Sequence, residues 1–241
     1  MSDRKLPELN RQLALGLGLP DNALLDTYYP GDNVQALTHI KKIARGQGDF
    51  FLYLWGNPGS GCSHLLQGAC HLASEMNRSS MYLPLAQLYQ QAQSPDILKH
   101  LEQLDLVCLD DIQVIAGNCI WEEALFHLYN RLRDGGRTHC VIAGMHPCKS
   151  LGIQLPDLQS RLAWGVTYHL HLLGDEDKFN ALHLRAKMRG LDLPLDVGQF
   201  ILRRAARNMG ELYQLLEKLD EASMAAQRRL TIPFVKSLNL F

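Results

Sequence analysis

Short apolar segments alternate with amphipathic segments along most of the chain. Five apolar runs, at 50–56, 80–85, 104–112, 139–145 and 166–173, have the length and composition of strands. The stretches between them, such as 63–76 and 121–136, place apolar residues at helical spacing. This alternation predicts an α/β fold with a parallel sheet flanked by helices.

The pattern changes after Leu173, where one helical segment follows another. The segment 175–190 starts with Asp175, which we expect to be its N-cap, and stops at Gly190. A later helix begins near Asn208, which forms a capping-box-like pair with Glu211. We therefore expect a flexible tail at 1–23, an α/β nucleotide-binding domain at 24–173 and an all-helical lid subdomain at 174–241.

Composition and charge narrow the function classes. The chain of 241 residues is 46% hydrophobic and 20% charged, and its formal net charge of -1 gives no overall basic field for nucleic acids. No apolar run reaches the roughly 18 residues of a membrane span, and the N-terminus lacks a signal-peptide pattern. These features predict a cytoplasmic protein with no membrane partner.

The cysteines and histidines suggest neither disulfides nor a metal site. The six cysteines form no CxxC pairs, and His169 and His171 have no further candidate metal ligands nearby.

The sequence GNPGSGCS, residues 56–63, has the glycine frame of a phosphate-binding loop. It lies between a predicted strand and a predicted helix, where backbone N–H groups and the helix N-terminus converge on an anion. Cys62 stands where the motif has lysine, so the charge that reaches the β and γ phosphates is missing. Taken alone, the segment is equally compatible with a structural glycine turn.

A second motif strengthens the nucleotide-site interpretation. The run LVCLDDI ends a predicted strand with Asp110 and Asp111, an arrangement that places one carboxylate on a Mg²⁺ ion held by the hydroxyl of Ser63. Asp111 would lie in the second coordination shell, toward an attacking water. The alternative is a strand that ends in a solvated acidic turn.

A third feature is Arg161, flanked by apolar residues in LPDLQSRLAWG. An arginine here is either a solvated loop charge or a finger donated across an interface to a neighbour's nucleotide. The residues alone do not separate these two interpretations.

Together the blocks LDDIQ, SRLAWG and ARNMGELYQLLEKLD resemble the AAA+ core of the bacterial replication initiator DnaA, in order and spacing. The resemblance covers about residues 24 to 240, and it stops where DnaA would continue into its DNA-binding domain. A DnaA-like core of this kind behind a short tail is similar to the Hda family, whose members work with the sliding clamp to inactivate DnaA. The implied fold is that of an AAA+ P-loop NTPase.

The resemblance implies a nucleotide site and its residues. Ser63 and Asp110 are the implied metal pair, and whether Mg²⁺ is bound stays open. Met209 and Gly210 of the lid are expected near the nucleotide. The residues implied in nucleotide binding are Tyr28, Tyr29, Pro30, Asn57, Pro58, Gly59, Ser60, Gly61, Cys62, Ser63 and His64.

Three family positions have lost the groups that address a γ-phosphate. They are the P-loop lysine at Cys62, the acidic sensor-1 position at Met145 and the sensor-2 arginine at Gly210. The resemblance therefore implies a bound ADP or another nucleoside diphosphate with little or no hydrolysis, while Arg161 is kept in the finger position. The base preference stays open.

The tail carries a peptide that resembles the clamp-docking sequence Q-L-x-L-x-L. Gln12 supplies hydrogen bonds, and Leu13, Leu15 and Leu17 supply apolar anchors for a pocket on the clamp. The alternative is a low-complexity Leu/Gly tail.

These inferences predict a negative regulator of replication initiation. Its partners would be DnaA and the β sliding clamp of DNA polymerase III, with DNA reached only indirectly through the clamp, and with Arg161 acting on DnaA-bound ATP. Self-association stays open, because AAA+ cores use the same faces for it. Two alternatives remain at this point, a weak AAA+ ATPase that loads or remodels a partner, and a DnaA-like adaptor without nucleotide chemistry.

Overall fold

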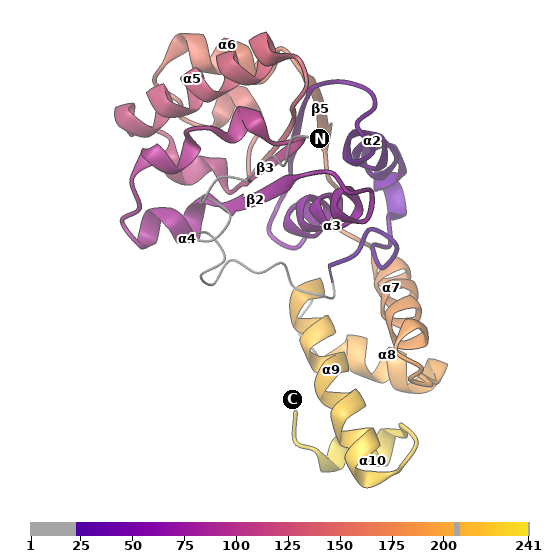
Figure 1. Ribbon diagram of the computed structural model, residues 1–241. Helices are drawn as coiled ribbons and strands as arrows, with labels where there is room; N and C mark the ends of the chain where they lie inside the picture. The colour runs from indigo at the N-terminus through magenta and orange to yellow at the C-terminus, as the bar shows by residue number, and fades with distance from the viewer. Residues whose placement is uncertain (1–22, 205–207, 241) are drawn as a thin grey trace.

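A single parallel sheet organises the first part of the molecule. The computed structural model describes residues 23–204 and 208–240, and its five strands are arranged in the order β2-β3-β4-β1-β5 (Figure 1). The predicted α/β fold with a C-terminal helical lid is confirmed. The strands are β1 (Phe51–Trp55), β2 (Ser80–Pro84), β3 (Leu106–Asp110), β4 (His139–Gly144) and β5 (Val166–His169).

The side chains of successive strand residues pack alternately into two hydrophobic layers, one on each face of the sheet. Phe51 and Tyr53 of β1 pack into one layer, whereas Leu52 and Leu54 pack into the other. Both faces are buried because helices cover each of them, which explains the continuous apolar runs in the sequence. The first layer includes residues of α4 (Leu85–Gln90), α5 (Cys119–Gly135) and α6 (Pro156–Ala163), and the second those of α2 (Val34–Ala44) and α3 (Cys62–Glu75).

Short 3-10 turns connect several of these elements. They are η1 (Gly31–Asn33), η2 (Pro95–Leu98), η3 (Leu101–Gln103), η4 (Ile112–Ile115) and η5 (Cys148–Ser150).

The fifth strand ends earlier than its apolar pattern suggests. Beyond His169 the chain is held by a side chain: Asn33 Nδ2 donates to the carbonyl of His171 (2.9 Å), and the N–H of His171 donates to Asn33 Oδ1 (2.8 Å). The Asn33 side chain thus satisfies both backbone groups of His171, just after the N–H of Leu170 has made the last bond to β1, at the carbonyl of Trp55 (2.7 Å). Asn33 itself is buried.

The lid consists of α7 (Asp175–Met188), α8 (Leu195–Arg204), α9 (Met209–Ala226) and α10 (Ile232–Ser237), and it extends away from the sheet (Figure 1). Its own core contains Leu182, Val197, Leu216 and Leu219. The expectation that Asp175 is an N-cap is wrong, because Asp175 is the first helical residue and Gly174 takes the cap position. Asn208 does cap α9, with Oδ1 accepting from the N–H of Gly210 (2.8 Å).

A buried glutamate fixes the start of the helix that carries Arg161. Glu122 of α5 is 1% exposed, and its carboxylate accepts the backbone N–H groups of Gly117 (2.6 Å), Gln154 (3.0 Å) and Leu155 (2.8 Å). Leu155 is the N-cap residue of α6. The Glu122 carboxylate therefore accepts hydrogen bonds from the backbone both in the loop before α5 and at the start of α6.

We expect Glu122→Ala to lower the free energy of unfolding by about 3 kcal/mol or more, because it leaves buried N–H groups without acceptors. Chemical denaturation followed by circular dichroism measures this change. Glu123→Ala, at the exposed neighbouring position, is the control. Equal stabilities of the two variants would contradict the role assigned to Glu122.

Candidate nucleotide site

A cleft of about 380 Å³ lies where the carboxyl ends of β1, β4 and β3 meet the start of α9. These three strands are neighbours in the sheet, so their C-terminal loops open on the same edge, which is where α/β sheets bind ligands. The cleft is lined by Gly56, Asn57, Pro58, Gly59, Ser60, Gly61, Cys62, Ser63, His64, Asp110, Asp111, Gly144, Met145, Asn208, Met209, Gly210 and Tyr213.

The glycine-rich loop has the geometry of a main-chain anion cradle. Gly59 and Gly61 adopt positive φ angles of 89° and 95°, which L side chains rarely take. Gly61 is the N-cap of α3, and it has no side chain to occupy the first N–H groups of that helix. Those groups face the cleft at the positive end of the helix dipole. The loop can therefore hold a phosphate without a lysine.

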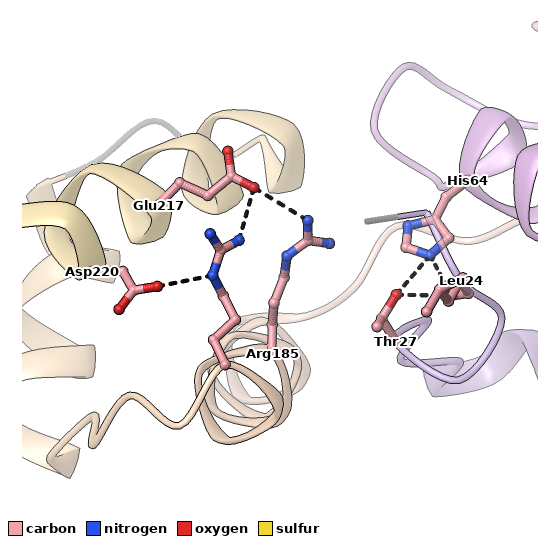
Figure 2. Close-up of polar contacts among 7 residues, drawn as sticks. Leu24, Thr27, His64, Arg185, Glu217 and Asp220 are labelled. Carbon is pink, nitrogen blue, oxygen red and sulfur yellow. Dashed lines mark hydrogen bonds and ion pairs between the residues drawn. The ribbon is translucent and has the colours of Figure 1, made fainter. Parts of the chain in front are cut away.

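Two aromatic side chains pack around this loop and the start of α3. The Tyr28 hydroxyl donates to the carbonyl of Ser60 (3.4 Å), and its ring lies where a Cβ on Gly61 would come within 2.6 Å. His64 Nε2 donates to the carbonyl of Leu24 (2.8 Å) and lies 3.2 Å from Thr27 Oγ1 (Figure 2). Burial lowers the pKa of His64, so this histidine is neutral at neutral pH.

The segment YYPGDN lies beside the cleft. Tyr28, Tyr29 and Pro30 fall outside the residues that line it. Tyr29 instead bridges to the lid, where its hydroxyl accepts from Asn180 Nδ2 on α7 (3.3 Å). Contact of these three residues with a base stays a prediction.

The acidic pair sits at the end of β3 in two different environments. Asp110 is 3% exposed, accepts the Tyr82 hydroxyl through Oδ2 (2.8 Å) and accepts the backbone N–H of Asp111 through Oδ1 (3.0 Å). Burial raises the pKa of Asp110, and a hydrogen bond from Ser63 opposes that rise. Asp111 adopts a positive φ of 58°, which turns the chain after the strand.

A hydroxyl beside a hydrogen-bonded carboxylate fits Mg²⁺, which binds through one or two protein oxygens together with phosphate oxygens. Ser63 and Asp110 would hold such an ion, and the ion would supply charge neutralisation at the phosphates. Within the residues described, no group of three or more His, Cys, Asp or Glu side chains could hold a metal ion by itself.

Cys62 brings a neutral group to the lysine position. Burial raises the pKa of the Cys62 thiol to about 12, with Asp110 and Asp111 adding to the rise. The sulfur lies 3.6 Å from Ser60 Oγ. At neutral pH Cys62 is therefore a neutral thiol, not a thiolate, and like any cysteine it supplies no cation at this position.

Met145 and Gly210 lie on opposite walls of the cleft. Met145 follows β4, and Gly210 is in the first turn of α9. A Cβ added to Gly210 would meet only the Asn208 Oδ1 atom, at 3.3 Å. Neither residue offers a charge or a side-chain hydrogen bond to a phosphate.

Sequence reasoning missed Gln113, which joins two walls of the site. Its Nε2 donates to Asp111 Oδ1 (3.0 Å), and its Oε1 accepts the N–H of Met145 (3.1 Å). The amide thus ties the acidic turn to the loop after β4. The signal available was its place as the last residue of LDDIQ.

The lid contributes a second feature that the sequence analysis missed. The Arg185 guanidinium lies over the ring of Tyr213, 4.3 Å from its centroid, and Arg185 pairs with Glu217 at 3.5 Å (Figure 2). Tyr213 lines the cleft, whereas Arg185 is 6% exposed. A buried cation therefore backs the lid wall of the site.

Arg161 lies on α6 and is not among the residues that line the cleft. It is half-buried and close enough to Tyr129 of α5 for its charge to oppose the burial-driven rise in the pKa of that phenol. Trp164, at the end of the same helix, is 71% exposed. Gln12, Leu13, Leu15 and Leu17 lie outside the described residues.

A sequence model described as the bacterial DnaA ATPase domain matches residues 19–169, which is more than half of the chain. The chain belongs to the bacterial DnaA ATPase family. A second model, described as the lid domain of Hda, matches residues 175–238. The protein is thus an Hda-like, DnaA-related AAA+ protein, as the sequence motifs predict.

Solved structures show the same fold at low sequence identity. Domain III of Thermotoga maritima DnaA is 21% identical with a TM-score of 0.75, covering 90% of this chain and 95% of that chain. AMPPCP-bound DnaA from Aquifex aeolicus is 21% identical with a TM-score of 0.69, covering 84% and 66%. The Holliday junction branch migration motor RuvB of Thermotoga maritima is 15% identical with a TM-score of 0.63, covering 86% of this chain and 67% of that chain.

In the part of the chain that the structure describes, no helix has the length and apolar character to cross a membrane.

We expect Cys62→Lys to tighten binding of a nucleoside triphosphate by about tenfold or more, because it restores a cation within reach of the β and γ phosphates. Cys62→Ala is the matched control and should leave affinity nearly unchanged, since the thiol is neutral. Titration calorimetry with magnesium and a non-hydrolysable triphosphate measures the difference. Equal affinity of the lysine and alanine variants would show that residue 62 does not face the phosphates.

Proposed function

We propose that this DnaA-related protein is a negative regulator of replication initiation that stimulates hydrolysis of DnaA-bound ATP. In this proposal its own cleft holds a nucleoside diphosphate, ADP in the simplest case, and hydrolyses little or nothing. Arg161 acts in trans at the nucleotide of DnaA. The position of Arg161, on a helix away from its own cleft, is the observation that carries the proposal.

The chemistry of the cleft supports a binding rather than a hydrolytic role. Its main-chain cradle suits the phosphates that a diphosphate retains. The groups that would stabilise a transferring γ-phosphate are replaced by a neutral thiol at Cys62, a thioether at Met145 and a hydrogen atom at Gly210. Each missing electrostatic contact to the transition state lowers the rate steeply.

The surroundings of Arg161 support a role at an interface. Glu122 holds the entry to α6, so the helix is presented in one position. Trp164 follows on the same helix with most of its ring exposed, and exposed tryptophans are frequent anchors of protein interfaces. An arginine donated in trans can accelerate nucleotide hydrolysis by about 10³ to 10⁵.

In this proposal the N-terminal tail recruits the protein to the sliding clamp on DNA. The peptide from Gln12 to Leu17 would dock on the β sliding clamp, with Leu13, Leu15 and Leu17 in an apolar pocket. The clamp would thereby concentrate the regulator on replicated DNA, where DnaA is to be inactivated.

We expect Arg161→Ala to lose stimulation of DnaA on the order of 10³-fold, because the charge that would stabilise the transition state is removed. The assay follows hydrolysis of DnaA-bound ATP with this protein and DNA-loaded clamp. Arg133→Ala, on the neighbouring helix α5, should stimulate like the parent chain.

The purified chain without DnaA is the blank, and it should show negligible turnover. Stimulation by Arg161→Ala equal to that of the parent would disprove the finger assignment. Rapid turnover by the chain alone would instead identify an ATPase.

We expect Gln12→Ala combined with Leu13→Ala to abolish retention on DNA-loaded clamp, because both the polar contact and the first apolar anchor are removed. Co-elution of the protein with loaded clamp on gel filtration measures retention. Asn10→Ala with Arg11→Ala, just before the peptide, is the control. Unchanged retention of the Gln12 and Leu13 variant would remove the tail from the proposal.

A further inference from the structure

Four cations gather on the lid, at the end of α8, on α10 and in the turn that follows α9. Arg204 of α8 lies 5.1 Å from the centroid of the Phe200 ring, and the Lys236 ammonium of α10 lies 5.5 Å from the same centroid. Arg228, in the turn between α9 and α10, lies 5.9 Å from the Phe234 ring. Arg229 follows it, and these four cationic side chains are exposed. We call these four residues the basic end of the lid.

Two carboxylates of the neighbouring helix are paired with other arginines. Glu217 and Asp220 of α9 are engaged by Arg185 of α7 and by Arg189, which follows that helix (Figure 2). Arg189 donates to Asp220 Oδ2 (3.0 Å) and to Glu217 Oε1 (3.0 Å), and Arg185 shares the latter. Among the described residues, no ion pair involves the four cations of the basic end.

The backbone holds the arginine turn in a fixed conformation. Gln227 takes a left-handed conformation with φ of 50°, the N–H of Arg228 donates to the carbonyl of Ser223 (3.1 Å), and the Ser223 hydroxyl donates to the carbonyl of Arg228 (2.6 Å). Leu230 is then buried in the lid core. The turn is a helix cap with its hydrophobic contact, so the arginines project from an ordered backbone.

We propose that the basic end of the lid contacts the phosphate backbone of duplex DNA without sequence preference. Cations that lie close together repel each other, and an anion between them offsets that repulsion. The phosphates along a DNA backbone would offer each cation its own negative charge. The two rings beneath the cations are not available for stacking, since Phe234 is buried and Phe200 is half-buried. This arrangement favours duplex over single strands, whose binding relies on stacked bases.

None of the four cations of the basic end lines the nucleotide cleft. The cleft touches the first turn of α9, and the arginine turn follows its last residue, 18 residues along the helix. At the α-helical rise this separation is roughly 25 Å. The contact would give the protein a direct route to DNA, in addition to the expected route through the clamp, and it can be tested with neither clamp nor DnaA present.

The test is fluorescence anisotropy of a labelled duplex of arbitrary sequence, titrated with the full chain at several salt concentrations. Arg204→Glu with Lys236→Glu should weaken binding on the order of tenfold or more and reduce the slope of log K against log salt by roughly 2. Lys42→Glu with Arg45→Glu, exposed at the end of α2, changes the net charge equally and should weaken binding far less. Arg228→Gln with Arg229→Gln is a milder variant that preserves the fold and should also lower the slope.

Three results would overturn the proposal. One is equal loss of affinity in the α2 control, which would indicate an effect of net charge alone. Another is tighter binding of single strands than of duplex by the parent chain. The third is absence of duplex binding while the parent chain binds vesicles containing phosphatidylglycerol, which would assign the basic end to a membrane surface.

Discussion

Two hydrogen bonds between the Asn33 side chain and the backbone of His171 fix the junction between the sheet and the lid. A primary amide donates and accepts at once, so it satisfies both backbone groups where the strand partner ends. Asn33 is buried and His171 is exposed, so the two bonds are partly shielded from water. The Tyr29 to Asn180 contact adds a second link from the same N-terminal segment to α7. The position of α9 over the cleft depends on this junction.

In the proposed function the cleft separates two properties that a P-loop usually combines. Phosphate binding by such a loop relies largely on main-chain N–H groups, and Gly59 and Gly61 have the positive φ angles that such a loop uses. Hydrolysis needs charges aimed at the γ-phosphate, and these depend on side chains. Substitutions at single side chains can therefore remove the second property while the backbone preserves the first. Cys62 illustrates this, because a neutral thiol stands at the position of the lysine and does not supply its charge.

The sequence allowed the strands and the principal helices to be predicted because each signal is local. The apolar run of β3 and the glycine pattern of residues 56–61 can each be recognised from a few consecutive residues. The roles of Asn33 and Gln113 were not predictable in this way. Asn33 acts across 138 residues of sequence and Gln113 across 32, and such contacts leave no periodic pattern. Asp175 shows the opposite error, since a favourable cap residue became the first helical residue while the preceding glycine took the cap conformation.

The net charge of -1 hides an uneven distribution of acidic and basic side chains over the lid. Glu217 and Asp220 of α9 pair with Arg185 and Arg189, whereas no ion pair among the described residues involves the four cations of the basic end. Helix α9 is continuous from the cleft to that end, so the two ends of the lid move together. A ligand bound at one end influences the other only if its contacts differ between positions of the lid. The Asn33 and Tyr29 contacts join the N-terminal segment to the chain that leads into the lid, so such a difference would act through them.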